Sequence, residues 1–148
     1  MPNWCRNSAI FSHSDTNNVA ELAKLIRAKG EVFQHLRPMP ESESDNWYDW
    51  CNKNWGTKWD AHECELCNSQ ENWLSCTFET AWTPPIALFN YLKTQGWSIE
   101  CEYMEDEVGF IGKYNDGVNE CFNMHELDLI TCDELREWAR SCFEPIGE

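Results

Sequence analysis

A group of aromatic, amide and charged side chains between residues 50 and 82 has the chemistry of a binding site for a small molecule. The group consists of Trp50, Asn54, Trp55, Lys58, Asp60 and Trp82. Flat aromatic faces beside an amide, an ammonium group and a carboxylate can hold a base, a sugar or a peptide by stacking and a few directed hydrogen bonds. The same tryptophans can instead cover a sheet as part of the core, because large aromatic side chains mostly serve packing. Packing is the interpretation that we favour.

An imidazole and two thiols lie between Asp60 and Trp82 of this group. His62, Cys64 and Cys67 are residue types that suit the tetrahedral shell of zinc. A second pair of ligands is missing, and alternation along a strand would send the two cysteines to opposite faces. None of the four histidines lies in a local cysteine motif that would activate a thiol. We therefore expect free structural cysteines, no metal or other cofactor, and no catalytic residue that can be named.

Acidic side chains dominate the last third of the chain. The formal net charge is −15, and residues 97–148 supply 14 acidic and three basic residues, a net charge of −11. Such a field repels phosphate backbones and attracts cationic protein surfaces over a Debye length of about 8–10 Å, which disfavours direct binding of nucleic acid. Negative charge also commonly serves solubility alone. The residues expected to contact a partner are Glu100, Glu102, Glu105, Asp106, Glu107, Asp116 and Glu120.

Length and composition predict one folded domain. A chain of 148 residues can bury a core without staples, and 42% hydrophobic with 14% aromatic residues is too much core material for a disordered protein. The nine cysteines form no paired framework, which favours reduced thiols. Apolar runs are too short for a membrane span, and the first residues lack the plan of a signal peptide. We therefore expect a soluble protein in the cytoplasm.

The pattern of the chain predicts an α+β fold. Strands are expected at 4–12, 63–67, 73–80, 97–103 and 108–114, and helices between Asn17 and Gly30, between Thr83 and Gly96, and at 133–142. Val19, Leu22, Ala23 and Ile26 recur at helical spacing, and residues 115–117 are a strong turn signal. Leu74, Cys76 and Phe78 alternate with polar residues along one expected strand, as do Trp97, Ile99, Cys101 and Tyr103 along another. Gly30 is expected to be a left-handed C-terminal cap and Thr83 an N-terminal cap. In this order, the elements predict a ferredoxin-like split β-α-β sandwich with both main helices on one face of the sheet, an appended β-hairpin and a C-terminal helix.

Two segments lie outside that core pattern. Residues 31–61 form a Trp-rich insertion, in which Pro38, Pro40 and the acidic, serine-containing stretch 41–45 are expected to break regular structure. Within it, Trp47, Trp50 and Cys51 share helical spacing, as do Trp55 and Trp59, and Gly56 is expected to mark a break between the two pairs. Residues 117–148 form an acidic C-terminal extension. Either the insertion or this extension could cover the second face of the sheet.

Four strings of the sequence carry a family resemblance. They are MPNWCRN at 1–7, LRPMPE at 36–41, WYDWCNKNWGTKWDA at 47–61 and TAWTPP at 80–85. They resemble strings of the YubB-like, ferredoxin-domain family of bacteriophage and plasmid proteins, and the resemblance spans roughly residues 1–115. It implies a ferredoxin-like domain, an origin in a mobile element and a bacterial cytoplasm, but no activity and no catalytic residues.

These patterns lead to three hypotheses of function. The first is a non-catalytic phage or plasmid accessory protein whose acidic surface binds a basic host protein, such as a nucleic-acid-binding or defence factor, by imitating the phosphates of DNA. The second is a small-ligand-binding protein or enzyme that uses the Trp-lined insertion. The third is a packing domain without a ligand of its own. An exposed sheet edge could also support a homo-oligomer.

Overall fold

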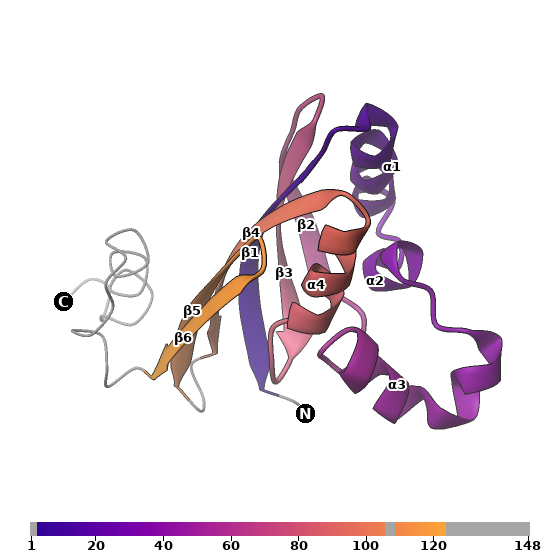
Figure 1. Cartoon of the computed structure of the whole chain (residues 1–148), viewed down its shortest axis with the longest axis vertical. Helices are drawn as coiled ribbons and strands as arrows, with labels where there is room; N and C mark the ends of the chain where they lie inside the picture. The colour runs from indigo at the N-terminus through magenta and orange to yellow at the C-terminus, as the bar shows by residue number, and fades with distance from the viewer. Residues whose placement is uncertain (1–2, 106–108, 124–148) are drawn as a thin grey trace.

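The described residues form one antiparallel sheet with helices on one of its faces (Figure 1). The computed structural model describes residues 3–105 and 109–123. The strands are β1 (Trp4–His13), β2 (His62–Ser69), β3 (Trp73–Ala81), β4 (Trp97–Glu105), β5 (Phe110–Asn115) and β6 (Val118–Asn123). The helices are α1 (Thr16–Arg27), α2 (Val32–Leu36), α3 (Trp47–Asn54) and α4 (Ile86–Thr94), with the 3-10 helix η1 (Glu41–Asn46) before α3. The fold is therefore α+β, as predicted.

Six strands are paired in the order β2-β3-β1-β4-β5-β6, and every neighbouring pair is antiparallel. β1 lies between β3 and β4, with Ala9 opposite Cys76 on one side and Cys101 on the other. These three small residues are buried under the helices. The alternation of Leu74, Cys76 and Phe78 toward the core is confirmed for β3. Among the helices of the described ranges, none is long and apolar enough to cross a membrane.

α1 packs on the sheet as its periodicity predicts, but its end differs from the prediction. The apolar stripe of Val19, Leu22, Ala23 and Ile26 is buried. The residue with a left-handed backbone is Lys29 (φ 59°), not Gly30. The helix ends one residue too early for Gly30 to take that role. Instead the N–H of Gly30 donates to the carbonyl of Leu25 (3.0 Å), so the glycine permits a close approach to the Leu25 side chain.

The Trp-rich insertion contains more regular structure than predicted. Pro38 and Pro40 separate α2 from η1, and the stretch expected to be irregular is itself the 3-10 helix. A proline is tolerated before the first turn of a helix, which is where Pro40 stands. The helical spacing of Trp47, Trp50 and Cys51 is confirmed by α3.

The helical pairing expected for Trp55 and Trp59 is wrong. α3 ends at Asn54, and Gly56 follows with a φ of 87°, which breaks the helix between the two tryptophans. The expected cap of α4 by Thr83 is also wrong. Its hydroxyl donates to the carbonyl of Gly56 (2.6 Å), and α4 begins only after Pro85.

The chain after β4 departs further from the predicted elements. The turn at 115–117 is confirmed, and β6 is an additional edge strand that the sequence pattern does not indicate. The helix expected at 133–142 lies outside the described residues, as do Asp106, Glu107 and most of the acidic extension.

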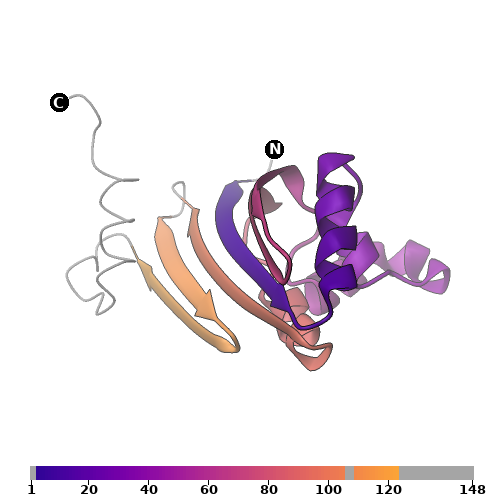
Figure 2. The ribbon, with the colours of Figure 1, turned by 90° about the horizontal axis from the view of Figure 1, so that it is seen from above.

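The two faces of the sheet differ in their cover (Figure 2). The helices of the described ranges lie on one side, and the insertion belongs to that side, because Phe33, Cys51 and Trp55 are members of the main core. The insertion therefore does not cover the second face. On that second face, Met104 and Ile111 are paired neighbours and fully buried, whereas Ser8, Thr77 and Glu100 are exposed.

Candidate functional site

The sheet surface opposite the helices, which we call the open face, gathers polar side chains from strands that are distant in sequence. Register fixes this arrangement, because residues that pair across antiparallel strands point to the same side. Ser8 of β1 lies opposite Thr77 of β3 and Glu102 of β4. Arg6 lies opposite Glu79 of β3 and Met104 of β4. The outward residues of β1, β3 and β4 thus form one continuous surface.

Carboxylates outnumber cationic groups on the described part of the open face. They are Glu63 and Glu65 of β2, Glu79 of β3, Glu100 and Glu102 of β4, and Glu120 of β6. The described cationic side chains of the strands on this face are Arg6 and Lys113, and Lys113 pairs in register with Glu102 and Glu120. The open face therefore carries a net negative charge that is held on a rigid sheet.

A cleft of about 470 Å³ opens on this face over β1, β2 and β3. Its wall includes Glu63, Glu65 and Glu79, together with Arg6, Ser8 and Met104. The cleft thus combines three carboxylates with one guanidinium group, and Glu65 is also paired with Lys29 of the segment between α1 and α2 (3.0 Å). This combination suits an extended cationic side chain, whose stem can contact apolar atoms while its head meets carboxylates.

An irregularity in β2 turns extra polar side chains toward the cleft. His62 lies opposite Glu79, and Glu65 lies opposite Thr77, so Glu63 and Cys64 together face the single residue Phe78. This is a β-bulge, and Glu63 takes a φ of 48° within it. Beyond the bulge, β2 pairs regularly with β3 again. Glu65 therefore points to the open face, as its partner Thr77 does, while Cys64 packs against the core.

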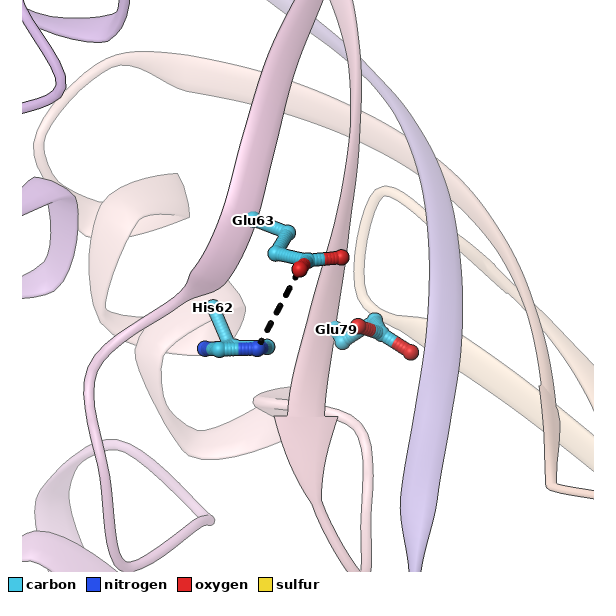
Figure 3. A group of neighbouring side chains, drawn as sticks. All are labelled: His62, Glu63 and Glu79. Atoms are coloured by element: carbon cyan, nitrogen blue, oxygen red, sulfur yellow. Dashed lines mark ion pairs between the residues drawn. The ribbon is translucent and has the colours of Figure 1, made fainter.

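His62, Glu63 and Glu79 form a compact group at the bulge (Figure 3). Their nearest ligand-type atoms all lie within 4.8 Å of one another, and His62 Nε2 is 3.7 Å from Glu63 Oε1. The imidazole stacks on the ring of Trp4, with centroids 4.5 Å apart and planes 14° apart. Trp4 in turn contacts Trp59, at 6.1 Å between centroids. Aromatic contacts thus hold the imidazole beside the two carboxylates.

Three of the predicted partner-contact residues lie on the open face. These are Glu100, Glu102 and Glu120. Glu105 is fully buried at the end of β4, so its predicted place on an exposed acidic surface is wrong. Asp116 lies in the β5–β6 turn with a φ of 44°, and its carbonyl accepts a hydrogen bond from Lys93 Nζ (2.6 Å).

Trp55 and Asn54 of the predicted small-molecule site are held by contacts within the insertion. Trp55 is buried and contacts Trp50 at 5.6 Å, and its Nε1 donates to the carbonyl of Arg37 (3.0 Å). Asn54 donates its amide to the Trp50 carbonyl (2.9 Å). The packing interpretation is therefore confirmed for Trp55. A ligand role for these residues stays a prediction.

The three remaining members of that predicted site are held in different ways. The Asp60 carboxylate accepts hydrogen bonds from the backbone N–H groups of residues 33, 34 and 61. Burial raises the pKa of Asp60, although these backbone bonds oppose the shift. Lys58 Nζ lies 4.4 Å from the ring centre of Trp59, and Trp82 is 45% exposed with a φ of 70°.

The two thiols near His62 belong to different surroundings. A hydrogen bond with Cys76 lowers the pKa of Cys64, and the same contact together with burial raises the pKa of Cys76. Cys67 is exposed and does not belong to this pair of thiols. His62 is therefore grouped with Glu63 and Glu79 rather than with the thiols. The signal that sequence reasoning missed is a glutamate beside a histidine, with a second glutamate on the paired strand.

No family model, no curated protein and no solved structure matches this chain. The family resemblance of the four sequence strings therefore stays a prediction, and the function is argued from the geometry of the open face.

Proposed function

We propose that this chain is a non-catalytic accessory protein that binds the cationic surface of another protein through the open face of its sheet. The observation that carries the proposal is the concentration of carboxylates from β2, β3, β4 and β6 on that face, against Arg6 and Lys113 of the described strands and Lys29, which pairs with Glu65 (3.0 Å). Complementary charge raises the rate of encounter and selects against like-charged partners. Nucleic acid is such a like-charged partner.

The cleft is the part of this surface that gives the interaction geometric selectivity. Glu63, Glu65 and Glu79 line it, and a carboxylate can accept two parallel hydrogen bonds from a guanidinium group. An arginine of the partner fits this chemistry best, with its guanidinium group between the carboxylates. The sheet holds the carboxylates in fixed positions, so little backbone entropy is lost when the partner binds.

The fold supports a more specific version of the proposal. The order β2-β3-β1-β4, with α1 after β1 and α4 after β3, is the arrangement of a split β-α-β-β-α-β sheet. We propose a ferredoxin-like core of this type, extended by β5 and β6, in a protein of the phage and plasmid family that the sequence strings resemble. Its partner is then a host nucleic-acid-binding or defence protein, whose basic groove accepts carboxylates in place of phosphates.

Affinity capture from a bacterial lysate tests this proposal with two matched variants. In the first, Glu65→Lys, Glu79→Lys and Glu100→Lys reverse charges on the open face. In the second, Glu21→Lys, Glu41→Lys and Asp49→Lys make the same change in charge at exposed positions of the helical side. Wild type and the second variant should retain a basic protein that double-stranded DNA displaces, and the first variant should lose it.

Salt provides the second arm of the same experiment. Raising the salt from about 0.1 M to 1 M shortens the Debye length from ~10 Å to ~3 Å, so the captured protein should be released. Capture that is equal in both charge variants, or that persists in high salt and in excess DNA, would contradict the proposal.

A further inference from the structure

The His62, Glu63 and Glu79 group has a composition that binding to a cationic protein does not require. Carboxylates alone would serve that purpose, whereas this group adds an imidazole whose Nε2 points toward Glu63 (Figure 3). We propose that these three side chains bind one divalent transition-metal ion. This site lies at the edge of the open face and goes beyond the proposed function, since it requires no partner.

The distances suit a single ion. Zinc holds nitrogen and oxygen ligands at about 2.0–2.2 Å, which places tetrahedral ligands roughly 3.4 Å from one another. His62 Nε2 and Glu63 Oε1 are already 3.7 Å apart, and the whole group lies within 4.8 Å. The largest of these separations therefore has to shorten by at most about 1.4 Å. Rotation of the exposed His62 and Glu63 side chains and of the half-buried Glu79 side chain can supply it.

The backbone and an aromatic neighbour position all three ligands before an ion binds. His62 and Glu79 are paired across β2 and β3, which fixes the separation of their Cα atoms. The bulge brings Glu63 to the same side, in a left-handed conformation that a glutamate rarely adopts. Stacking on Trp4 limits the orientation of the imidazole. The ion then adds the positive charge that the two adjacent carboxylates attract.

The ligand types select the class of metal. Imidazole nitrogen suits zinc, copper, iron and nickel, whereas calcium and magnesium prefer shells made of oxygen alone. Three protein ligands leave a coordination position for water or for a donor atom from another molecule. Glu63 and Glu79 also line the cleft, so this open position lies at the cleft's edge.

Titration of the reduced, isolated chain with Co²⁺ tests the site directly. One equivalent should saturate the protein and give visible ligand-field bands without a thiolate-to-cobalt charge-transfer band. Loss of an outer-shell partner alone costs roughly 10–100-fold in metal affinity. Glu79→Gln and His62→Ala each remove a side chain that coordinates the ion directly, so each should weaken cobalt binding by at least about 100-fold. Excess Mg²⁺ should leave the wild-type spectrum unchanged, whereas Zn²⁺ should displace the cobalt.

Matched controls separate this site from other acidic groups and from the cysteines. Glu71→Gln makes the same change in charge in the turn between β2 and β3, outside the group and the cleft, and should keep the wild-type affinity, as should Cys67→Ser. Mn²⁺ should broaden the amide resonances of residues 62, 63 and 79 first. Thermal unfolding of the metal-free variants shows whether each is folded.

Three results would overturn the inference. They are the absence of saturable cobalt binding by the wild type, unchanged affinity in a folded Glu79→Gln variant, or a thiolate charge-transfer band. None of these measurements involves a protein partner, so the metal site and the proposed function can fail independently.

Discussion

Asp60 holds the start of α2 by accepting hydrogen bonds from the backbone N–H groups of Phe33 (2.8 Å) and Gln34 (3.0 Å). Helix termini leave such donors without partners inside the helix, and a carboxylate that accepts them stabilises the fold. From the sequence alone, an aspartate near several tryptophans also fits a ligand-binding site, and Asp60 is a member of the predicted small-molecule site for that reason. The sequence shows that an acid is present at position 60. It does not show that the chain folds so that this acid meets backbone N–H groups 26 and 27 residues earlier.

Replacing Asp60 distinguishes a structural role from a ligand role. Asp60→Ala removes the cap and leaves the Phe33 and Gln34 donors unsatisfied, so the free energy of unfolding should fall by about 1–3 kcal/mol in urea titrations. Lys58→Ala loses only a contact with the half-exposed Trp59 ring and should cost less than about 1 kcal/mol. Equal stability of Asp60→Ala and wild type would show that the cap contributes nothing.

Individual elements differ in how far local pattern determines them. The alternation in β3 and β4 and the apolar stripe of α1 are strong local signals, and the structure confirms them. β6 is mostly exposed at a sheet edge, so its residues carry no apolar alternation to detect. The bulge at Glu63 is likewise absent from any local pattern, because pairing with β3 imposes it. The sequence shows His62 and Glu63 side by side, but strand pairing and the bulge are what bring Glu79 beside them.

A glycine of β5 controls the attachment of the β5–β6 hairpin. Gly112 lies opposite Tyr103, and the tyrosine ring occupies the space that a side chain at position 112 would need. The Tyr103 hydroxyl then donates to Asn119 of β6 (2.6 Å). Gly112→Ala should displace the ring, weaken this link, and lower the free energy of unfolding by about 1–3 kcal/mol.

An exposed residue of the neighbouring strand provides the comparison for this prediction. Ser98→Ala on β4 should change the free energy of unfolding by no more than about 0.5 kcal/mol in the same urea titration. If Gly112→Ala is as stable as Ser98→Ala, the close packing of Tyr103 on β5 is not needed to hold the hairpin.

In the whole molecule, one face of the sheet packs against the helices and the other face carries the carboxylates of the strands. The net charge is visible in the sequence, which places most of it in the last third. The open face instead draws carboxylates from positions 63 to 120, because strand order and register bring β2, β3, β4 and β6 to one surface. Such long-range pairing has no local signature. Composition therefore predicts an acidic binding surface, and the fold shows where that surface lies.

Chemical-shift mapping with a short oligo-arginine peptide tests the role of the open face most directly. The ¹⁵N-labelled chain is titrated at about 0.1 M and 1 M salt, between which the Debye length falls roughly threefold. We expect the largest shifts at amides of Ser8, Thr77 and Glu100, their disappearance at high salt, and their loss in the Glu65→Lys, Glu79→Lys, Glu100→Lys variant. Shifts centred on α1 or α3, or binding that is indifferent to salt and to this variant, would contradict the account.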